Sequence, residues 1–106
     1  MVVKVTEATF EQEVLKSEFP VLLDCYADWC GPCKMMSPVV DKMAEVFAGR
    51  LKVCKLNVDE DGAAVMQYNV MSIPNFLFFK NGEVVKNMVG GMAPAAFQAA
   101  IEEALA

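Results

Sequence analysis

The sequence predicts an α/β domain in which a central mixed β-sheet is flanked by helices on both faces. Residues 21–27 and 76–79 are too continuously apolar for strands with one face in water, which indicates central strands covered on both sides. A helical pattern lies between strand-like runs in the first half of the chain, an order typical of a parallel crossover. Asn81-Gly82 joins the apolar run at residues 76–79 to a strand-like run at residues 83–89, which predicts an antiparallel hairpin with a type I′ turn.

The N-terminal elements follow from local patterns. Residues 2–5 are rich in valine, which favours a short first strand. Thr6 or Thr9 opens the first helix, and Thr9 with Gln12 three residues later fits a capping box. The next strand spans residues 21–27 and is interrupted by one acid, Asp24.

The remaining elements follow in order along the chain. A second helix is predicted over residues 32–47, where apolar residues recur at helical spacing, and Gly49 ends it. Residues 51–58 form the next strand, and residues 59–62 form a turn that leads into a short helix. After the hairpin, Pro94 fits the first turn of a C-terminal helix.

The composition is that of a single domain spanning residues 1–106. The net charge of −5 and the pI of about 4.6 argue against nucleic acid as a partner, because phosphate binding needs clustered Lys and Arg. No run of about 18 apolar residues indicates a membrane span. The first ten residues have neither the apolar core nor the cleavage site of a signal peptide, so we expect a cytoplasmic protein.

A Cys-x-x-Cys pair, Cys30 and Cys33, lies where the apolar strand meets the second helix. The first turn of a helix leaves backbone N–H groups unpaired and carries a partial positive charge, and both favour a thiolate. Cys30 is therefore the predicted reactive sulfur. Cys33 lies one turn inside the helix, close enough to bond to Cys30 and less able to reach solvent. The pair is expected to exist as a dithiol or as a disulfide.

Two other uses of this spacing stay open on the motif alone. Zinc sites contain such pairs, but the chain has no histidine, and its other cysteines, Cys25 and Cys54, stand singly in strand-like runs. A structural disulfide that closes so small a loop constrains the unfolded chain little. Thiol–disulfide exchange accounts for the pair better.

Further motifs are spread along almost the whole chain. They are Asp24, the run Ala27-Asp28-Trp29-Cys30-Gly31-Pro32-Cys33-Lys34, Pro38, Lys55-Leu56-Asn57-Val58-Asp59, Ile73-Pro74, Phe79-Lys80-Asn81-Gly82 and Gly90. Together they closely resemble the thioredoxin family. The resemblance implies the thioredoxin fold and a general protein-disulfide reductase and electron donor that acts on multiple protein disulfides. It also implies re-reduction by a thioredoxin reductase and a redox-active Cys30–Cys33 disulfide, with no bound cofactor or metal. We expect a monomer.

The resemblance assigns chemical roles to four residues. Cys30 resembles the family's nucleophile, which forms a mixed disulfide with the substrate, and Cys33 resembles the thiol that resolves it. Asp24 is similar to a buried carboxylate that accepts the proton of the resolving thiol, and burial favours its protonated form. Lys55 matches a lysine that modulates this carboxylate. The residues alone leave open an ordinary strand-end Asp24 and a solvated Lys55.

The resemblance also implies a substrate-binding surface around Cys30. Pro74 looks like the family's cis-proline, and Ile73 before it offers backbone hydrogen bonds to an extended peptide. The other members of this surface are Trp29, Gly31, Pro32, Val89, Gly90 and Gly91.

The residues between the cysteines bear on the direction of electron flow. A histidine there would stabilise the thiolate and make the disulfide a stronger oxidant, and Gly31-Pro32 supplies no such charge. Electron donation is therefore favoured. Two alternatives stay open: a disulfide oxidase or isomerase of the same fold, and a docking subunit of a larger enzyme in which redox cycling is incidental.

Some positions depart from the family pattern. Asn75 follows the proline where Thr is usual, and Cys25 and Tyr26 stand where aromatic residues, often Trp and Phe, are common. These departures bear on partner choice more than on chemistry.

The two cysteines outside the motif are related by strand parity. If Asp24 and Lys55 share one face of the sheet, Cys25 and Cys54 lie on the opposite face. We expect both to be inert buried thiols.

Overall fold

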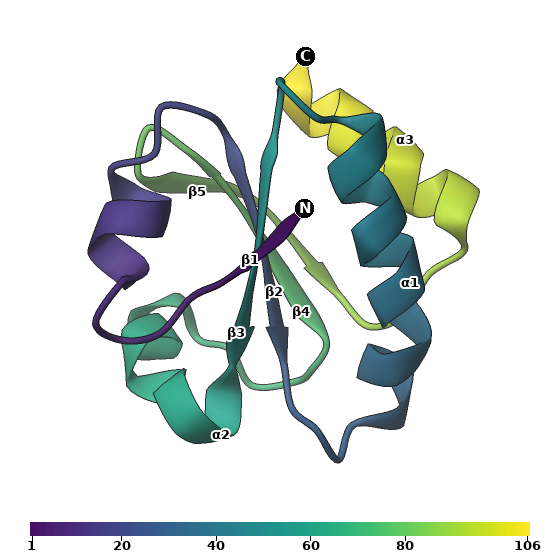
Figure 1. Ribbon diagram of the computed structural model, residues 1–106. Coiled ribbons are helices and arrows are strands. Elements are labelled where there is room, and N and C mark those ends of the chain that lie inside the picture. Colours follow the sequence, from purple (N-terminus) through teal and green to yellow (C-terminus); the bar gives the residue numbers. More distant parts are fainter.

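A five-stranded mixed sheet forms the centre of the computed structural model, which describes residues 1–106 (Figure 1). Its strands are β1 (Val2–Lys4), β2 (Val21–Tyr26), β3 (Lys52–Asn57), β4 (Asn75–Lys80) and β5 (Glu83–Val89), in the spatial order β1-β3-β2-β4-β5. β1 and β2 run parallel to β3, whereas β4 is antiparallel to β2 and β5. The predicted mixed sheet is confirmed.

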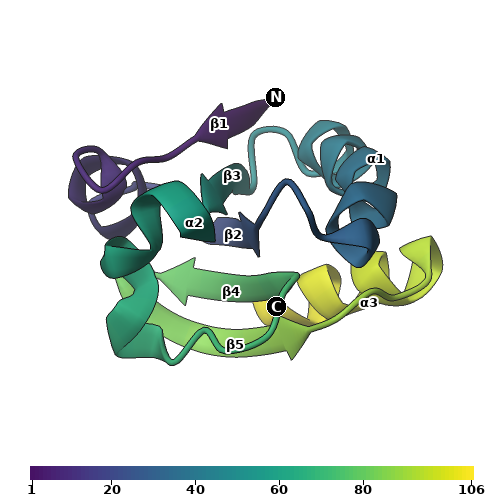
Figure 2. The same ribbon diagram turned by 90° about the horizontal axis from the view of Figure 1, so that it is seen from below.

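Helices cover both faces of this sheet, as predicted (Figure 2). One face carries α1 (Gly31–Val46) and α3 (Pro94–Leu105). The other carries η1 (Glu11–Leu15), a short segment with π-type hydrogen bonds, together with α2 (Val58–Asp61) and the 3₁₀-helix η2 (Gly62–Tyr68). The connection from β2 to β3 runs through α1, so the predicted parallel crossover is present.

The central strands are apolar throughout because both of their faces are buried. In β2, Leu22 packs into the cluster under α1 and α3, whereas Leu23 packs into the cluster on the opposite face. β4 divides in the same way, with Phe76 on the first side and Leu77 on the second. Such strands lack the polar alternation of a sheet with one wet face.

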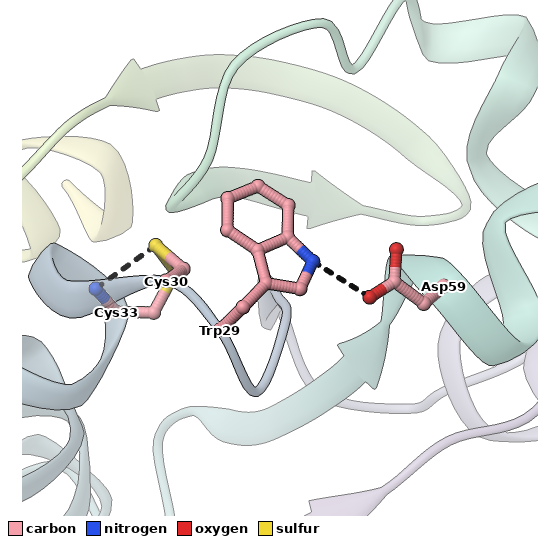
Figure 3. Close-up of a disulfide and its surroundings, with 4 residues drawn as sticks. All are labelled: Trp29, Cys30, Cys33 and Asp59. Carbon is pink, nitrogen blue, oxygen red and sulfur yellow. Dashed lines mark hydrogen bonds between the residues drawn. A yellow bond between two sulfur atoms is a disulfide. The ribbon is translucent and has the colours of Figure 1, made fainter.

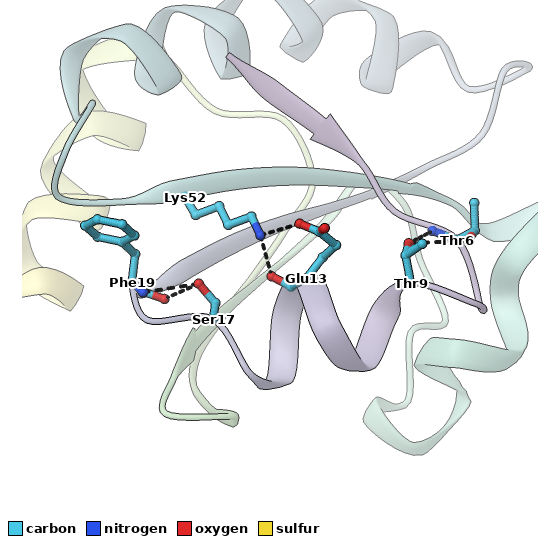
Figure 4. Close-up of polar contacts among 6 residues, drawn as sticks. All are labelled: Thr6, Thr9, Glu13, Ser17, Phe19 and Lys52. Atoms are coloured by element: carbon cyan, nitrogen blue, oxygen red, sulfur yellow. Dashed lines mark hydrogen bonds and ion pairs between the residues drawn. The ribbon is translucent and has the colours of Figure 1, made fainter.

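The N-terminal helix begins differently from the prediction (Figure 4). The Thr9 hydroxyl accepts a hydrogen bond from the N–H of Thr6 at 2.9 Å, and no side chain caps η1. The predicted capping box of Thr9 and Gln12 is wrong, because the preceding turn uses the hydroxyl. Lys52 of β3 anchors the segment, since its ammonium group donates to the main-chain carbonyl of Glu13 at 2.9 Å and also to the Glu13 carboxylate.

The turn predicted over residues 59–62 is mostly part of helix α2, which passes directly into η2. The Asn57 side chain caps α2 by accepting hydrogen bonds from the N–H groups of Asp59 at 2.9 Å and Glu60 at 3.3 Å. An Asn cap followed by acidic residues is a common helix start, so the signal was present in the sequence.

The β4–β5 hairpin has the predicted turn. Asn81 and Gly82 both have positive φ angles, of 52° and 80°, as a type I′ turn requires. The hairpin brings the end of β5 next to the start of β4, where the segment carrying Pro74 enters the sheet.

Candidate active site

The two cysteines of the motif form a disulfide at the N-terminus of α1 (Figure 3). Cys30 is the N-cap residue of α1, and its sulfur accepts a hydrogen bond from the N–H of Cys33 at 3.2 Å. Pro32 suits the first turn because proline has no N–H that would remain unpaired there. The same N–H and the helix dipole would stabilise a thiolate at Cys30 once the disulfide is reduced.

Exposure does not distinguish the two sulfurs in the disulfide form. Cys30 is 3 % exposed and Cys33 is 5 % exposed, so the prediction that Cys33 is the less accessible residue is wrong for this form. The two residues differ in their surroundings instead, because Cys33 lines a cavity that Cys30 does not reach.

This cavity of about 340 Å³ also contains the predicted proton acceptor, Asp24. Its lining consists of Asp24, Tyr26, Ala27, Asp28, Cys33, Lys34, Ser37 and Lys55. Asp24 is 7 % exposed, and its Oδ1 atom has no hydrogen-bond partner. Burial raises the pKa of Asp24 to about 7, the nearby Lys55 ammonium opposes this rise, and Asp41 adds to it. Asp24 can therefore exchange a proton near neutral pH, in a cavity with room for water.

Lys55 lies beside Asp24 across the β2–β3 pair but forms no ion pair with it. Its ammonium nitrogen is 5.9 Å from the centre of the Tyr26 ring, within the range of a cation–π contact. The Lys55 charge therefore lowers the pKa of Asp24 without a direct ion pair between the two groups.

Trp29 lies on the surface next to the disulfide, with 70 % of its area exposed (Figure 3). Its indole N–H donates to the Oδ2 atom of Asp59 at 2.8 Å, and Asp59 is itself positioned by the cap of Asn57. Neither Asp59 nor Asn57 was among the predicted site residues. The cap could have been found from the sequence, but the contact with Trp29 depends on how β3 and the β2–α1 loop lie together.

The Ile73–Pro74 peptide bond is cis, which confirms what the resemblance implied. Ile73 packs against the small cluster that contains Cys30 and Cys33, so this segment lies beside the disulfide. Neither the N–H nor the C=O of Ile73 is bonded to another backbone group. The Pro74 carbonyl, by contrast, accepts a hydrogen bond from the N–H of Gly90 at 2.8 Å.

The other predicted surface residues come from the first turn of α1, the end of β5 and the loop that follows it. Gly31, Pro32 and Gly91 are exposed, and Val89, the last residue of β5, is 53 % exposed. Gly90 has a φ of +89°, a conformation that favours glycine. A groove of about 510 Å³ runs between α1 and the 91–94 loop and is lined mainly by apolar residues: Pro32, Met35, Met36, Val39, Gly91, Met92, Ala93 and Pro94.

Cys25 and Cys54 share the face of the sheet opposite Asp24 and Lys55, as the parity argument predicted. Both are free thiols with no exposed surface. Burial raises the pKa of Cys25 to about 12 and that of Cys54 to about 11. Both groups are therefore protonated at neutral pH, and the thiol form is a poor nucleophile.

Thiol titration of the reduced protein is expected to separate these two pairs. At pH 8, Cys30 and Cys33 should react rapidly with an aromatic disulfide reagent, whereas Cys25 and Cys54 should react only after unfolding in guanidinium. The measurement is the absorbance of the released thiolate before and after denaturant is added. Four rapidly reacting thiols in the folded protein would contradict the assignment.

No group of three or more His, Cys, Asp or Glu side chains is placed to hold a metal ion. Cys25 and Cys54 lie in the core cluster on the η1 and η2 side of the sheet, apart from the cluster of Cys30 and Cys33. None of the helices has the length and apolar character needed to cross a membrane.

Comparison with known proteins identifies relatives along the whole chain. The sequence model of the Thioredoxin family matches residues 1–103. The thioredoxin of Pseudomonas aeruginosa is 46% identical over 101 residues, which cover 95% of this chain and 94% of the relative. Thioredoxin 1 of Nostoc sp. is 44% identical over 102 residues, or 96% of this chain and 95% of the relative. The chloroplastic M-type thioredoxin of Spinacia oleracea is 43% identical over 101 residues, or 95% of this chain and 56% of the relative.

A redox-active cysteine pair at a helix N-terminus in this mixed sheet defines a protein-disulfide oxidoreductase. The family model matches almost the whole chain, and the relatives named above also match most of it. Together these matches identify the family of oxidoreductases. The chain belongs to the thioredoxin family.

Proposed function

We propose that the protein is a general reductase of disulfides in other proteins and that it supplies electrons from the Cys30–Cys33 dithiol. The observation that carries this proposal is the position of the disulfide, with the Cys30 sulfur at the N-cap of α1 and bonded to the N–H of Cys33. That position favours a thiolate at Cys30, and the thiolate is the species that attacks disulfides.

The first step is attack by the Cys30 thiolate on one sulfur of the substrate disulfide. A bond forms between Cys30 and that sulfur, the substrate S–S bond breaks, and the other substrate sulfur leaves as a thiolate. The mixed disulfide joins the two proteins until the second thiol acts.

The second step is resolution of the mixed disulfide by Cys33. The Cys33 thiol loses its proton to the Asp24 carboxylate, directly or through water in the cavity that both residues line. The Cys33 thiolate then attacks the Cys30 sulfur, and the bond to the substrate breaks. The substrate is reduced by two electrons, and the protein is left with the Cys30–Cys33 disulfide. Lys55 modulates this step because its charge lowers the pKa of Asp24.

Recognition of the substrate is assigned to the backbone of Ile73 and the apolar surface around Cys30. The unpaired N–H and C=O groups of Ile73 lie in a segment beside the disulfide, which suits pairing with an extended peptide. Trp29, Gly31, Pro32, Val89, Gly90 and Gly91 supply the surrounding surface, with Pro74 at its base.

The cycle also needs a donor that restores the dithiol, and we assign this role to a thioredoxin reductase. The names of the relatives support this class of partner, since they are thioredoxins. We further propose that residues 1–106 act as one monomeric domain in the cytoplasm and need no bound cofactor beyond the cysteine pair.

The equilibrium reduction potential of the Cys30–Cys33 pair tests the direction of electron flow. Titration against defined thiol–disulfide buffers is expected to give a strongly reducing potential of about −270 mV, the value typical of thioredoxin. A value near about −120 to −180 mV, the range of disulfide oxidases and isomerases, would contradict the reductase and favour those functions.

A further inference from the structure

Two asparagines meet where the cis-proline segment enters the sheet. Asn75, the residue after Pro74, is 3 % exposed, and its side-chain oxygen accepts a hydrogen bond from the amide nitrogen of Asn87 in β5. The same nitrogen donates to the main-chain carbonyl of Phe76 at 3.3 Å. Asn87 thus uses both of its amide hydrogens on β4.

The strand register explains why these side chains meet. Asn75 is paired with Val89, and Leu77 is paired with Asn87, so the two asparagines are diagonal neighbours on one face of the antiparallel pair. The buried residues of β4 on that face are otherwise apolar. A buried amide without a partner is costly, and Asn87 provides the partner that Asn75 needs at this position.

The contact lies at the point where backbone pairing between the two strands ends. Beyond the pair of Asn75 and Val89, the remaining backbone link is the hydrogen bond from Gly90 to the Pro74 carbonyl. Ile73, one residue further, has no backbone partner. Asn75 is also paired with Cys25 of β2, and the contact between the asparagines adds a side-chain restraint at this base of the segment.

We propose that Asn75 and Asn87 are positioning residues whose amide contact holds the Ile73–Pro74 segment where it binds the peptide of a disulfide substrate. This inference rests on the proposed function. Neither asparagine hydrogen-bonds to Cys30 or Cys33, and neither lines the cavity that Cys33 shares with Asp24. The contact therefore acts on recognition of the peptide and leaves exchange at the sulfur atoms unchanged.

The test is a single-turnover reaction of the reduced protein with insulin at increasing concentrations, followed by the fluorescence of Trp29, the only tryptophan. In Asn75→Ala and Asn87→Ala, the half-saturating insulin concentration is expected to rise about five-fold, as for the loss of one hydrogen bond. The limiting rate should stay within about two-fold of wild type. The rate with 5,5′-dithiobis(2-nitrobenzoate), which has no peptide, and the reduction potential should not change.

Three further variants separate the hydrogen bond from general effects on the fold. Asn87→Leu keeps the approximate size of the side chain but can neither donate nor accept a hydrogen bond, so it should behave like Asn87→Ala. The double Ala variant should resemble each single variant, because all of them remove the same contact. Val85→Ala, at an exposed position of β5, is the matched control and should behave like wild type.

Several outcomes would overturn the inference. Equal losses with insulin and with the small disulfide would indicate a general structural role. Wild-type half-saturation in Asn87→Ala, or additive effects in the double variant, would show that the contact does not position the segment. If the wild-type protein itself reduced the small disulfide but not insulin, the proposed function would fail together with this inference. If the variants bind insulin more weakly than wild type but reduce the small disulfide at the wild-type rate, the result supports both the inference and the proposed function.

Discussion

Replacing Asp24 by Asn is expected to stabilise the protein at alkaline pH, by about 4 kcal/mol more near pH 9 than near pH 3. Burial raises the folded-state pKa of Asp24 from 3.8 to about 7. Below the unfolded-state pKa, both states hold the proton and the wild-type protein has its full stability. As the pH rises toward about 7, only the unfolded state releases the proton, so wild-type stability falls. Above that pH, the folded wild-type protein carries a buried charge, whereas the amide of the variant stays neutral.

The measurement is urea unfolding of both proteins across this pH range. Met35→Leu is the control, because Met35 is an exposed residue of α1 without a titratable side chain, so its effect should not vary with pH. A free-energy difference between wild type and Asp24→Asn that stays constant from about pH 3 to about pH 9 would contradict the raised pKa. The same variant should also resolve mixed disulfides more slowly near neutral pH, because Cys33 then lacks its proton acceptor.

Replacing either cysteine of the pair is expected to lower multiple-turnover reduction of insulin by at least about a thousandfold, but with different products. Cys33→Ser retains the attacking thiolate and lacks the resolving thiol, so it should accumulate a covalent mixed disulfide with the substrate. Cys30→Ser should form almost none, because it lacks the N-cap sulfur that the N–H of Cys33 and the helix dipole would stabilise as a thiolate. Non-reducing electrophoresis and intact mass spectrometry distinguish the two results.

The control for this experiment is the variant in which both Cys25 and Cys54 are replaced by Ala. These thiols are buried on the other face of the sheet, so turnover should be retained, although loss of packing should lower stability. Accumulation of a mixed disulfide in Cys30→Ser at the level of Cys33→Ser would overturn the assignment of the nucleophile. If the variant with both Cys30 and Cys33 replaced by Ser still activated a larger enzyme that binds this protein, that result would favour the alternative function as a docking subunit.

The fold was predictable from sequence because its strongest signals are local or nearly local. β2 and β4 are apolar throughout, since helices cover both of their faces, and the Asn81-Gly82 turn specifies its own backbone conformation. One error came from a side chain with two available partners. Thr9 bonds to the turn before it and does not cap the helix after it, and nothing in the local sequence decides between these hydrogen bonds.

The candidate site was predictable to a lesser degree. Cys30 and Cys33 come from one motif, and their bond needs only the first turn of α1. The cis state of Pro74 followed from the resemblance and not from the residues, because most X-Pro bonds in folded proteins are trans. The contact of Trp29 with Asp59 was not predicted, since it joins segments that follow two different strands.

The sequence by itself determined the α/β class, the redox motif and the parity that places Asp24 and Cys25 on opposite faces of β2, because each depends on neighbours along the chain. Only the tertiary structure decided which distant groups share an environment. The cavity that joins Asp24 to Cys33 forms where β2, β3 and α1 meet, and burial beside it gives Asp24 a pKa of about 7. The contact of Asn75 with Asn87 likewise depends on the register of β4 and β5. Proton affinity and hydrogen bonding respond to atoms that are close in space, and the order of residues does not record that closeness.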